Sequence, residues 1–373
     1  METLRHLLGK RSPKKDEELS ARTGISPERI GQLLSSAEPT LGELGAIANY
    51  FRIDMRDLLP LQPRHQSIDL LFRSGGRKVD EPTASALSRR IGYSVELLGE
   101  GARARPSWVA EFSRRGTTYD DAEANAEAFR RLFADDDQVS PLFRLPEIAM
   151  GAMKVLLFLL ATPRFEGASA FVDGLPFIFL AERFAPRMLF TLAHEIAHLL
   201  AHHDLSQSFA VVDVQTEGPR RASKNRDEFY AHAFASCLLL PRQGIGITLR
   251  KIRELQLEPN KELGDLDILL LSRVYGVSFY AAAKRCEDLS LLPRGGAASL
   301  NDSLNKKYGS PEKRAAAANL PPRPETQFPK LPIPLLHAAI EKVRSGEISV
   351  GKASSALGLS IADLLAANAP RVN

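Results

Sequence analysis

Two histidines and a glutamate at short spacing are the residues of this chain best suited to chemistry. The segment 187–203 reads RMLFTLAHEIAHLLAHH and contains His194, Glu195 and His198. Residues four apart lie on the same face of a helix, so both imidazoles can converge on one metal ion. Glu195 lies about 100° further around the helix, where its carboxylate can reach a water on that metal without being a ligand. The spacing predicts a zinc site with a general base beside it, which is the chemistry of a metallopeptidase.

A catalytic zinc ion needs a third protein ligand and an open position for water. His202 continues the ladder by one turn, but three ligands along one straight helix usually do not close a tetrahedron. Asp204 follows the second histidine by six residues, without a glycine to break the helix between them. Glu228 and His232 lie four apart in a helix predicted for 226–241, where either can face the metal while the other supports it. The spacing leaves this choice open.

The alternative interpretation is a pair of core or surface histidines on an amphipathic helix. The stretch 188–206 contains no proline or glycine, and Leu192, Leu199 and Leu200 supply the apolar sides of a buried helix. Glu195 favours catalysis over a purely structural metal site, because a structural site has no use for a base. The spacing alone also suits manganese or iron, since two histidines and a carboxylate bind those metals too.

Two apolar runs before the motif predict the elements that support it. Residues 168–180 read ASAFVDGLPFIFL, in which Asp173-Gly174 is a strong hairpin signal between two strand-like stretches. The longest apolar run, 150–162, is shorter than the roughly 20 residues of a membrane span, so we interpret it as buried core. We expect the strand Phe177–Leu180 to pair with an extended substrate.

Residues 1–62 have the spacing of a helix-turn-helix. Gly24 separates two short helical patterns, and Ser26 with Pro27 suits the start of the second. A third helix follows Thr40 as its cap. This order of helix, glycine turn and helix is typical of a small DNA-binding unit.

The same stretch resembles the XRE (Cro/repressor-type) family of DNA-binding domains. The matching residues are Leu19, Ala21, Gly24, Ile30, Pro39, Thr40, Leu44, Ala48 and Leu58-Leu59. The resemblance makes Pro27–Ser36 the recognition helix. It offers four side chains to bases or phosphates, Arg29, Gln32, Ser35 and Ser36. One departure is charge, since residues 1–60 carry nine Lys/Arg and nine Asp/Glu, with Glu28 on the recognition helix. Binding to protein instead of DNA is therefore the alternative.

Three blocks of the chain resemble the ImmA/IrrE family of metallopeptidases. The first is FTLAHEIAH over 190–198, preceded by Arg187. The second is Glu228-x-x-Ala231-x-x-Phe234-Ala235-x-x-Leu238-Leu239-x-Pro241, and the third is Val277-Ser278-x-x-Ala281-x-x-x-Arg285. They occur in this order over roughly 122–295. An N-terminal XRE unit is a recurring arrangement in that family.

The resemblance implies zinc ligands at His194, His198 and Glu228, with Glu195 as the catalytic residue. His232 stands where the family commonly has Asn or Asp, and Ala197 stands where Gly is frequent. The first departure leaves the role of His232 open. A donor to the oxyanion that forms during hydrolysis would assist catalysis, and the candidates are His232, His202 and Tyr230.

The fold class that follows is α+β and mainly helical. We expect a helix-turn-helix at 1–62, a helical connector at 63–121 and a zincin-like metallopeptidase core with a small sheet at 122–300. A Pro-rich linker at 301–334 and a small helical unit with helix-turn-helix spacing at 335–373 complete the prediction.

The composition limits the expected partners and the cellular compartment. The 373 residues carry a net charge of +4, which permits a nucleic-acid partner without requiring one. Two cysteines indicate a reducing compartment, and the N-terminal stretch lacks a signal peptide, so we expect a cytoplasmic protein without a membrane segment. A dimer is compatible with the sequence.

The function that the sequence and its resemblances predict is a zinc-dependent endopeptidase. Its expected substrate is a transcriptional repressor of the XRE type, cut in stress response or mobile-element control. The alternative is an XRE-type regulator or antitoxin in which the peptidase domain senses or binds and does not turn over. Neighbouring genes would discriminate between these functions.

Overall fold

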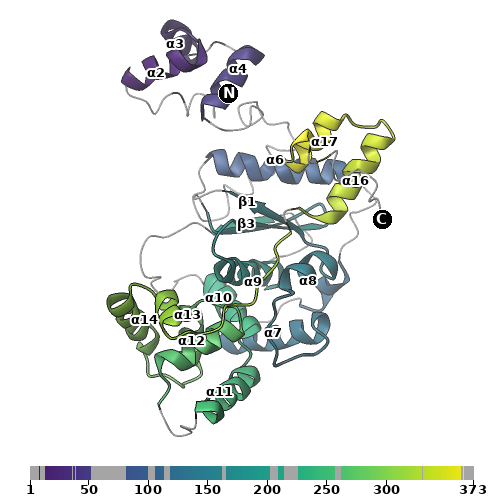
Figure 1. Ribbon diagram of the computed structural model, residues 1–373. Helices are drawn as coiled ribbons and strands as arrows, with labels where there is room; N and C mark the ends of the chain where they lie inside the picture. Colours follow the sequence, from purple (N-terminus) through teal and green to yellow (C-terminus); the bar gives the residue numbers. More distant parts are fainter. Residues whose placement is uncertain are drawn as a thin grey trace. The chain divides into compact units, whose positions relative to one another are not determined.

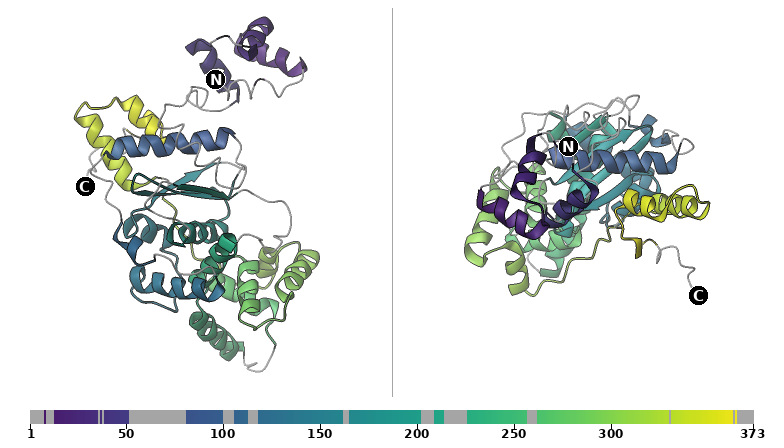
Figure 2. Two further views of the ribbon diagram at one scale, coloured as in Figure 1. Left: turned by 180° about the vertical axis from the view of Figure 1, so that it is seen from behind. Right: turned by 90° about the horizontal axis from the view of Figure 1, so that it is seen from above.

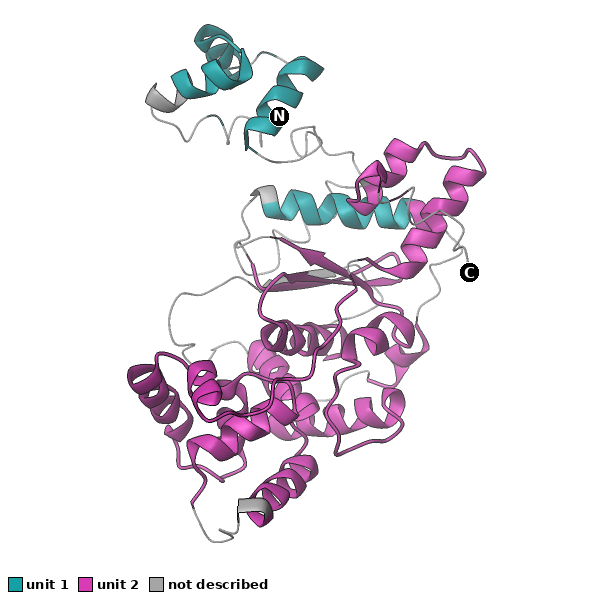
Figure 3. Cartoon of the chain, in the orientation of Figure 1, with its two compact units in different colours: residues 1–96 teal, residues 97–373 magenta. Residues whose placement is uncertain are grey.

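The computed structural model describes most of the chain, in two compact units that comprise residues 1–96 and 97–373 (Figure 3). The described residues are 8, 13–35, 37, 39–51, 81–99, 106–112, 118–161, 165–201, 209–213, 226–256, 262–329, 331–362 and 364. For 13–16, 81, 82, 209–213, 255, 256 and 355 the description covers the backbone alone.

In the described part of the N-terminal unit, three short helices surround a small core. They are α2 (Pro13–Thr23), α3 (Pro27–Ser35) and α4 (Leu41–Phe51), and α6 (Glu81–Leu98) follows further along the chain. Gly24 ends α2 with a φ of 70°, a value that glycine adopts without strain. The core consists of Leu8, Leu19, Ile25, Ile30, Leu33, Leu44, Ile47 and Ala48. The predicted helix-turn-helix spacing is therefore present in the fold.

Two side-chain caps fix the starts of α3 and α4. The Ser26 hydroxyl accepts a hydrogen bond from the backbone N–H of Arg29 at 3.2 Å. The Thr40 hydroxyl accepts from the N–H of Glu43, and the Glu43 carboxylate accepts from the N–H of Thr40 at 2.7 Å. Both caps were predicted at these residues, and the second is a reciprocal capping box.

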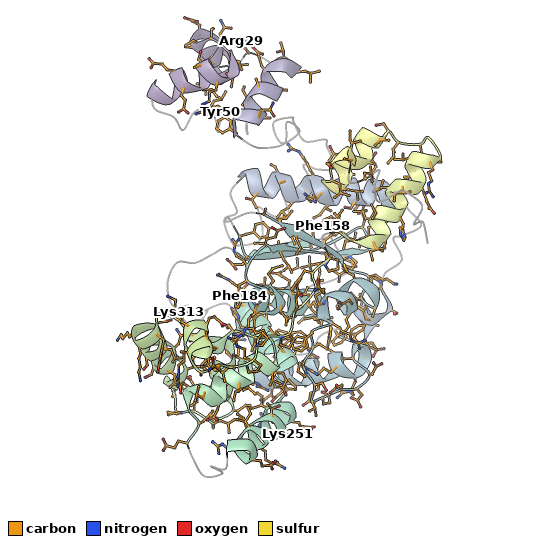
Figure 4. All side chains as sticks on the ribbon, viewed as in Figure 1. Arg29, Tyr50, Phe158, Phe184, Lys251 and Lys313 are labelled. Atoms are coloured by element: carbon orange, nitrogen blue, oxygen red, sulfur yellow. The ribbon has the colours of Figure 1, made fainter. Side chains whose placement is uncertain are left out.

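The second unit contains a small mixed sheet in the strand order β1-β3-β2-β4. The strands are β1 (Leu156–Leu160), β2 (Gly167–Val172), β3 (Leu175–Ala181) and β4 (Phe209–Asp213). β2 and β3 form the predicted antiparallel hairpin, and Asp173 and Gly174 in its turn both have positive φ, as a two-residue hairpin turn favours. On β1, Phe158 stacks on Phe179 of β3 with ring centroids 5.2 Å apart (Figure 4).

The prediction that Phe177–Leu180 pairs with a substrate is wrong, because β3 is an interior strand. β1 pairs with it in parallel over 177–181, and β2 pairs with it in antiparallel fashion over 175–180. Both backbone edges of the segment are therefore used within the sheet. Among the described strands, β1 and β4 are the ones at the sheet's edges.

Helices cover one face of this sheet in successive layers (Figures 1 and 2). The nearest helix is α9 (Ala185–Ala201), which packs on β2 and β3, and α8 (Leu145–Gly151) lies beside it. Next comes α10 (Arg226–Leu239), and α7 (Tyr119–Phe133) packs on the far side of α10. The core between sheet and helix includes Leu157, Ile178, Leu180, Leu189, Leu192 and Ile196. The predicted α+β, mainly helical class is confirmed.

A short 3-10 helix, η3 (Ser107–Ala110), also contributes to this core. The Trp108 indole N–H donates to the backbone carbonyl of Met153 at 2.9 Å, and Phe112 is buried in the same cluster. Residues that we placed in the helical connector therefore belong to the packed interior of the second unit.

Five helices follow α10 in the second unit before the last helical pair. α11 (Arg242–Gln256), α12 (Asp265–Val274) and α13 (Phe279–Asp288) lie within the predicted peptidase region. α14 (Gly296–Tyr308) and α15 (Pro311–Ala317) come next, and α16 (Ile333–Arg344) packs on α17 (Val350–Leu357). Across the described residues, no single helix is long and apolar enough to span a membrane, although α12 and α13 pass that test when the bent pair is counted together.

The prediction of an irregular linker over 301–334 is wrong for its first half. α14 runs to Tyr308, and α15 occupies 311–317. Proline did not prevent the second helix, because Pro311 stands at its first position and the Ser310 hydroxyl caps it by accepting from the N–H of Lys313. The other prolines of this region follow Leu320, where 321–329 forms no helix.

Candidate metal centre

The helix α9 places His194, Glu195 and His198 inside the second unit. Their residues are 2%, 0% and 2% exposed, in a segment whose leucines pack on the sheet and on α10. The Nε2 atoms of the two histidines are 3.1 Å apart, as the i, i+4 spacing predicts. Burying three polar side chains costs free energy, which hydrogen bonds or metal coordination offset. A buried group of this kind is therefore a candidate metal site.

The third side chain comes from α10, which packs against α9. One carboxylate oxygen of Glu228 lies 3.5 Å from Nε2 of His194, and the other lies 3.6 Å from Nε2 of His198. Glu228 is 4% exposed, and the three side chains form a group whose candidate ligand atoms all lie within 4.8 Å of one another.

These distances fit a divalent metal. Nitrogen and oxygen ligands about 2.0–2.2 Å from a tetrahedral zinc ion lie about 3.3–3.6 Å from one another. The observed separations of 3.1, 3.5 and 3.6 Å are close to this range, with the two histidine nitrogens each nearest to a different oxygen of the Glu228 carboxylate. All three groups donate electron pairs, and two imidazoles with one carboxylate are a common donor set for zinc, manganese or iron.

His232, one turn beyond Glu228 on α10, lies beside the candidate metal ligands. Its ring centroid is 4.6 Å from that of His194 and 5.9 Å from that of Phe190, and the residue is partly exposed. The spacing of the sequence left Glu228 and His232 open as third ligand. The structure brings the carboxylate of Glu228 to both histidine nitrogens and places the His232 ring against one ligand ring.

Tyr230 takes part in helix packing. It lies two residues from both Glu228 and His232, about 200° around the helix from each. Its hydroxyl is hydrogen-bonded to the amide of Asn125 on α7, and the residue is 0% exposed. Tyr230 therefore points to the α7 side of α10, which does not suit a donor beside the metal ligands. His202, Asp204 and Ser36 lie outside the described residues.

The start of β2 and the residue before it meet α9 through side chains and a glycine that the sequence did not indicate. A Cβ atom on Gly167 would lie 2.5 Å from Oε1 of Glu195 and 2.7 Å from Cγ2 of Thr191. The preceding residue, Glu166, is 4% exposed, and its carboxylate lies 2.7 Å from Nε of Arg187 on the first turn of α9. An acidic residue followed by glycine before an apolar strand is a weak signal, and which helix it meets depends on the fold.

Two buried arginines donate hydrogen bonds to backbone carbonyls at the C-terminal end of α10. Arg130 donates two hydrogen bonds to the carbonyl of Leu238, and Arg285 donates one to the carbonyl of Leu240. Burial lowers the pKa of Arg130 to about 10, so it remains charged at neutral pH. Arginine at the carbonyl end of a helix is favoured by the helix dipole. These contacts fix the helix that carries Glu228.

The candidate DNA-contacting residues of α3 make contacts within the N-terminal unit. Arg29 donates to both carboxylate oxygens of Glu43, at 2.7 and 3.1 Å, and to the side-chain oxygen of Gln32 at 3.3 Å (Figure 4). The Ser35 hydroxyl donates to the carbonyl of Gly31. The hydrogen bonds from Arg29 and from the backbone of Thr40 lower the pKa of Glu43 to about 2.

Comparison with known proteins assigns both regions to families. Residues 151–287 match the model of the IrrE N-terminal-like domain, which spans β1 to α13 and includes all three candidate ligands and Glu195. Residues 3–64 match the model of the Cro/C1-type HTH DNA-binding domain. No curated protein matches the chain. The chain thus carries a region that matches the IrrE N-terminal-like domain of the ImmA/IrrE family, preceded by a region that matches the Cro/C1-type helix-turn-helix domain.

Proposed function

We propose that the chain is a zinc-dependent endopeptidase that cuts a specific protein, and that this protein is a transcriptional repressor with a Cro/C1-type domain. The observation that carries the proposal is the meeting of His194, His198 and Glu228 from two packed helices, with Glu195 between the two histidines in the sequence. We propose zinc as the native metal because four-coordinate sites of nitrogen and oxygen ligands suit it. Manganese and iron are the alternatives to be measured.

In the proposed mechanism, the three candidate ligands and Glu195 have separate roles. When bound by His194, His198 and Glu228, a divalent cation supplies Lewis-acid activation of water and of the scissile carbonyl. Glu195 accepts the proton of the attacking water and passes it to the leaving amine, as a general base and then a general acid. The 0% exposure of Glu195 supports a proton transfer shielded from bulk water.

His232 is the residue for which we propose a supporting role. Its ring lies against the ring of His194, so it can restrict the orientation of that ligand, and it is partly exposed while the ligands are buried. A partly exposed donor beside a buried metal ligand also suits the oxygen of a tetrahedral intermediate. Outer groups of this kind change metal affinity or activity by about 10–100-fold.

The helix-turn-helix unit supports the choice of substrate. We propose that residues 1–62 bring the peptidase domain to the DNA region where the repressor is bound, with the peptidase itself within 122–300. The exposed surface of α3 includes Glu28, and Arg29 is paired with Glu43, so we expect the affinity of this unit for DNA to be modest. Cleavage of the repressor then relieves repression, in stress response or in mobile-element control.

The test uses the purified full chain loaded with zinc and the Cro/C1-type repressor encoded nearest to its gene. We expect the wild-type protein to cut the repressor at a defined site and to leave casein intact. Glu195→Ala should retain zinc and lose cleavage by about 100-fold or more. Equal cleavage by this variant would refute the assignment of the base. No cleavage by wild type under any inducing condition would favour a regulator that binds without turnover.

A further inference from the structure

We propose that Glu166 and Gly167, at the start of β2, are positioning residues that set the rotation and axial position of α9 and thereby aim the carboxylate of Glu195. The inference rests on the proposed role of Glu195 as the general base. It adds two residues to the site that are themselves neither candidate metal ligands nor acid–base groups of the proposed reaction.

The first argument is the spacing of the contacts along α9. Arg187, Thr191 and Glu195 follow one another at intervals of four residues, so they lie on one face of the helix. Arg187 meets Glu166, and the other two meet Gly167. Glu166, just before β2, and Gly167, its first residue, thus face more than two turns of the helix. A rotation or slide of α9 would break these contacts together.

The second argument is the closeness of approach at Gly167. A Cβ atom there would lie 2.5 Å from Oε1 of Glu195, 2.7 Å from Cγ2 of Thr191 and 3.0 Å from Cγ of Glu195. Real Cβ contacts are longer, so a side chain of any kind would displace one of these atoms. Thr191 is β-branched and stiff in a helix, so a Cβ here would push β2 and α9 apart, and the Glu195 carboxylate, at the end of a flexible side chain, would also have to turn away. Glycine is therefore needed here for space.

The third argument is electrostatic. A cation on the first turn of a helix is disfavoured by the helix dipole, and Arg187 occupies that position. Glu166 offsets this with a 2.7 Å ion pair, and Arg183 just before the helix lies 3.8 Å from its other oxygen. Glu166 is 4% exposed, so its negative charge is held where it also favours the amino-terminal end of α9.

The experiment is a double-mutant cycle on the full chain, read by thermal unfolding of the metal-free protein. We expect Gly167→Ala to lower Tm by several degrees, about 4–8 °C, as overpacking does. In the Glu195→Ala background, which removes the carboxylate, we expect at least about half of that loss to disappear. Gly246→Ala on α11 is the matched control, since a Cβ there meets nothing within 4 Å. An equal loss of Tm in both backgrounds would overturn the inference.

Activity on the repressor gives the second readout. We expect Gly167→Ala and Glu166→Gln each to lower kcat by about tenfold or more, with KM within about twofold and zinc affinity within about threefold. Glu166→Gln keeps the size of the side chain and is the variant to use if Gly167→Ala does not fold. Unchanged kcat in a folded variant would overturn the positioning role. If wild type cuts nothing, the proposed function fails, while the Tm cycle still decides whether Gly167 fixes Glu195.

Discussion

The candidate metal-ligand cluster of α9 and α10 and the Arg29–Glu43 pair of α3 and α4 each join side chains from two different helices. In the cluster, the contacts at 3.1–3.6 Å connect two imidazole nitrogens and a carboxylate, all of which donate electron pairs. In the pair, a guanidinium meets a carboxylate in two hydrogen bonds, and opposite charges cancel. The first arrangement suits a cation bound between its members, whereas the second joins opposite charges directly.

Burial separates the two regions further. The three candidate ligands are 2–4% exposed, so their electron pairs cannot be satisfied by bulk water. The side chains of Arg29 and Glu43 are 31% and 17% exposed, where solvent screens their attraction. We therefore expect metal binding to contribute strongly to the stability of the second unit. We expect the Arg29–Glu43 pair to contribute little to the stability of the first.

The largest effect is expected from a substitution that removes one of the three candidate metal ligands. Glu228→Ala removes the only carboxylate among the three candidate ligands and leaves two histidines on one helix. We expect zinc affinity to fall by more than about 100-fold, beyond the 10–100-fold cost of losing an outer-shell partner. Zinc should then no longer raise Tm, because stabilisation by a ligand follows its affinity. Competition titration with a zinc indicator measures the affinity.

The matched control is Glu127→Ala, which removes an exposed carboxylate from α7. It should leave the zinc titration unchanged. If Glu228→Ala bound zinc as tightly as this control, the third ligand would have to come from another residue, and His232 would be the first to test.

The features that could be predicted from the sequence are those formed by residues close together along the chain. His194 and His198 lie one helical turn apart, and the Asp173-Gly174 hairpin and the caps at Ser26 and Thr40 depend on four or fewer residues. Local geometry determines such features. The site's remaining parts depend on elements that meet only in the fold.

The choice between Glu228 and His232 is one example, because both occupy one face of α10 and only the packing of that helix on α9 decides which reaches the two nitrogens. The interior position of β3 is a second, since its partner β1 lies about twenty residues before it. The contact of Gly167 with Glu195 is a third, and no periodicity marks it. Resemblance to a family supplied Glu228, whereas it supplied neither Glu166 nor Gly167.

A smaller effect is expected when the ion pair between Arg29 and Glu43 is broken. Glu43→Gln removes the charge that holds Arg29 and leaves a cation on the recognition helix. We expect the full chain to bind a mixed-sequence DNA duplex about three- to tenfold more tightly, with the slope of log affinity against log salt steeper by about 0.9 for one added phosphate contact. Fluorescence anisotropy over a series of salt concentrations measures both quantities.

Glu28→Gln is the control for that measurement. It changes the formal charge of the unit by the same amount from an exposed position on α3, and it leaves Arg29 bound to Glu43. We expect a smaller gain in affinity from this variant. Equal gains would show that net charge alone matters, and that Arg29 is not withheld from DNA by its partner.

The smallest expected effect is the pH dependence of the same pair. The folded pKa of Glu43 is about 2, below its ordinary value of 4.5, because Arg29 and the backbone of Thr40 donate to the carboxylate. A lowered folded pKa contributes stability that is complete above the unfolded value and is lost as pH falls from about 4.5 toward 2. We expect exchange of the α3 and α4 amides, after correction for intrinsic rates, to be flat from pH 7 to 5. Relative to Glu43→Gln, protection should fall about fivefold or less by pH 3, the scale of a surface ion pair. A constant difference between wild type and variant down to pH 3 would contradict the coupling, because both proteins would then respond only to the other carboxylates.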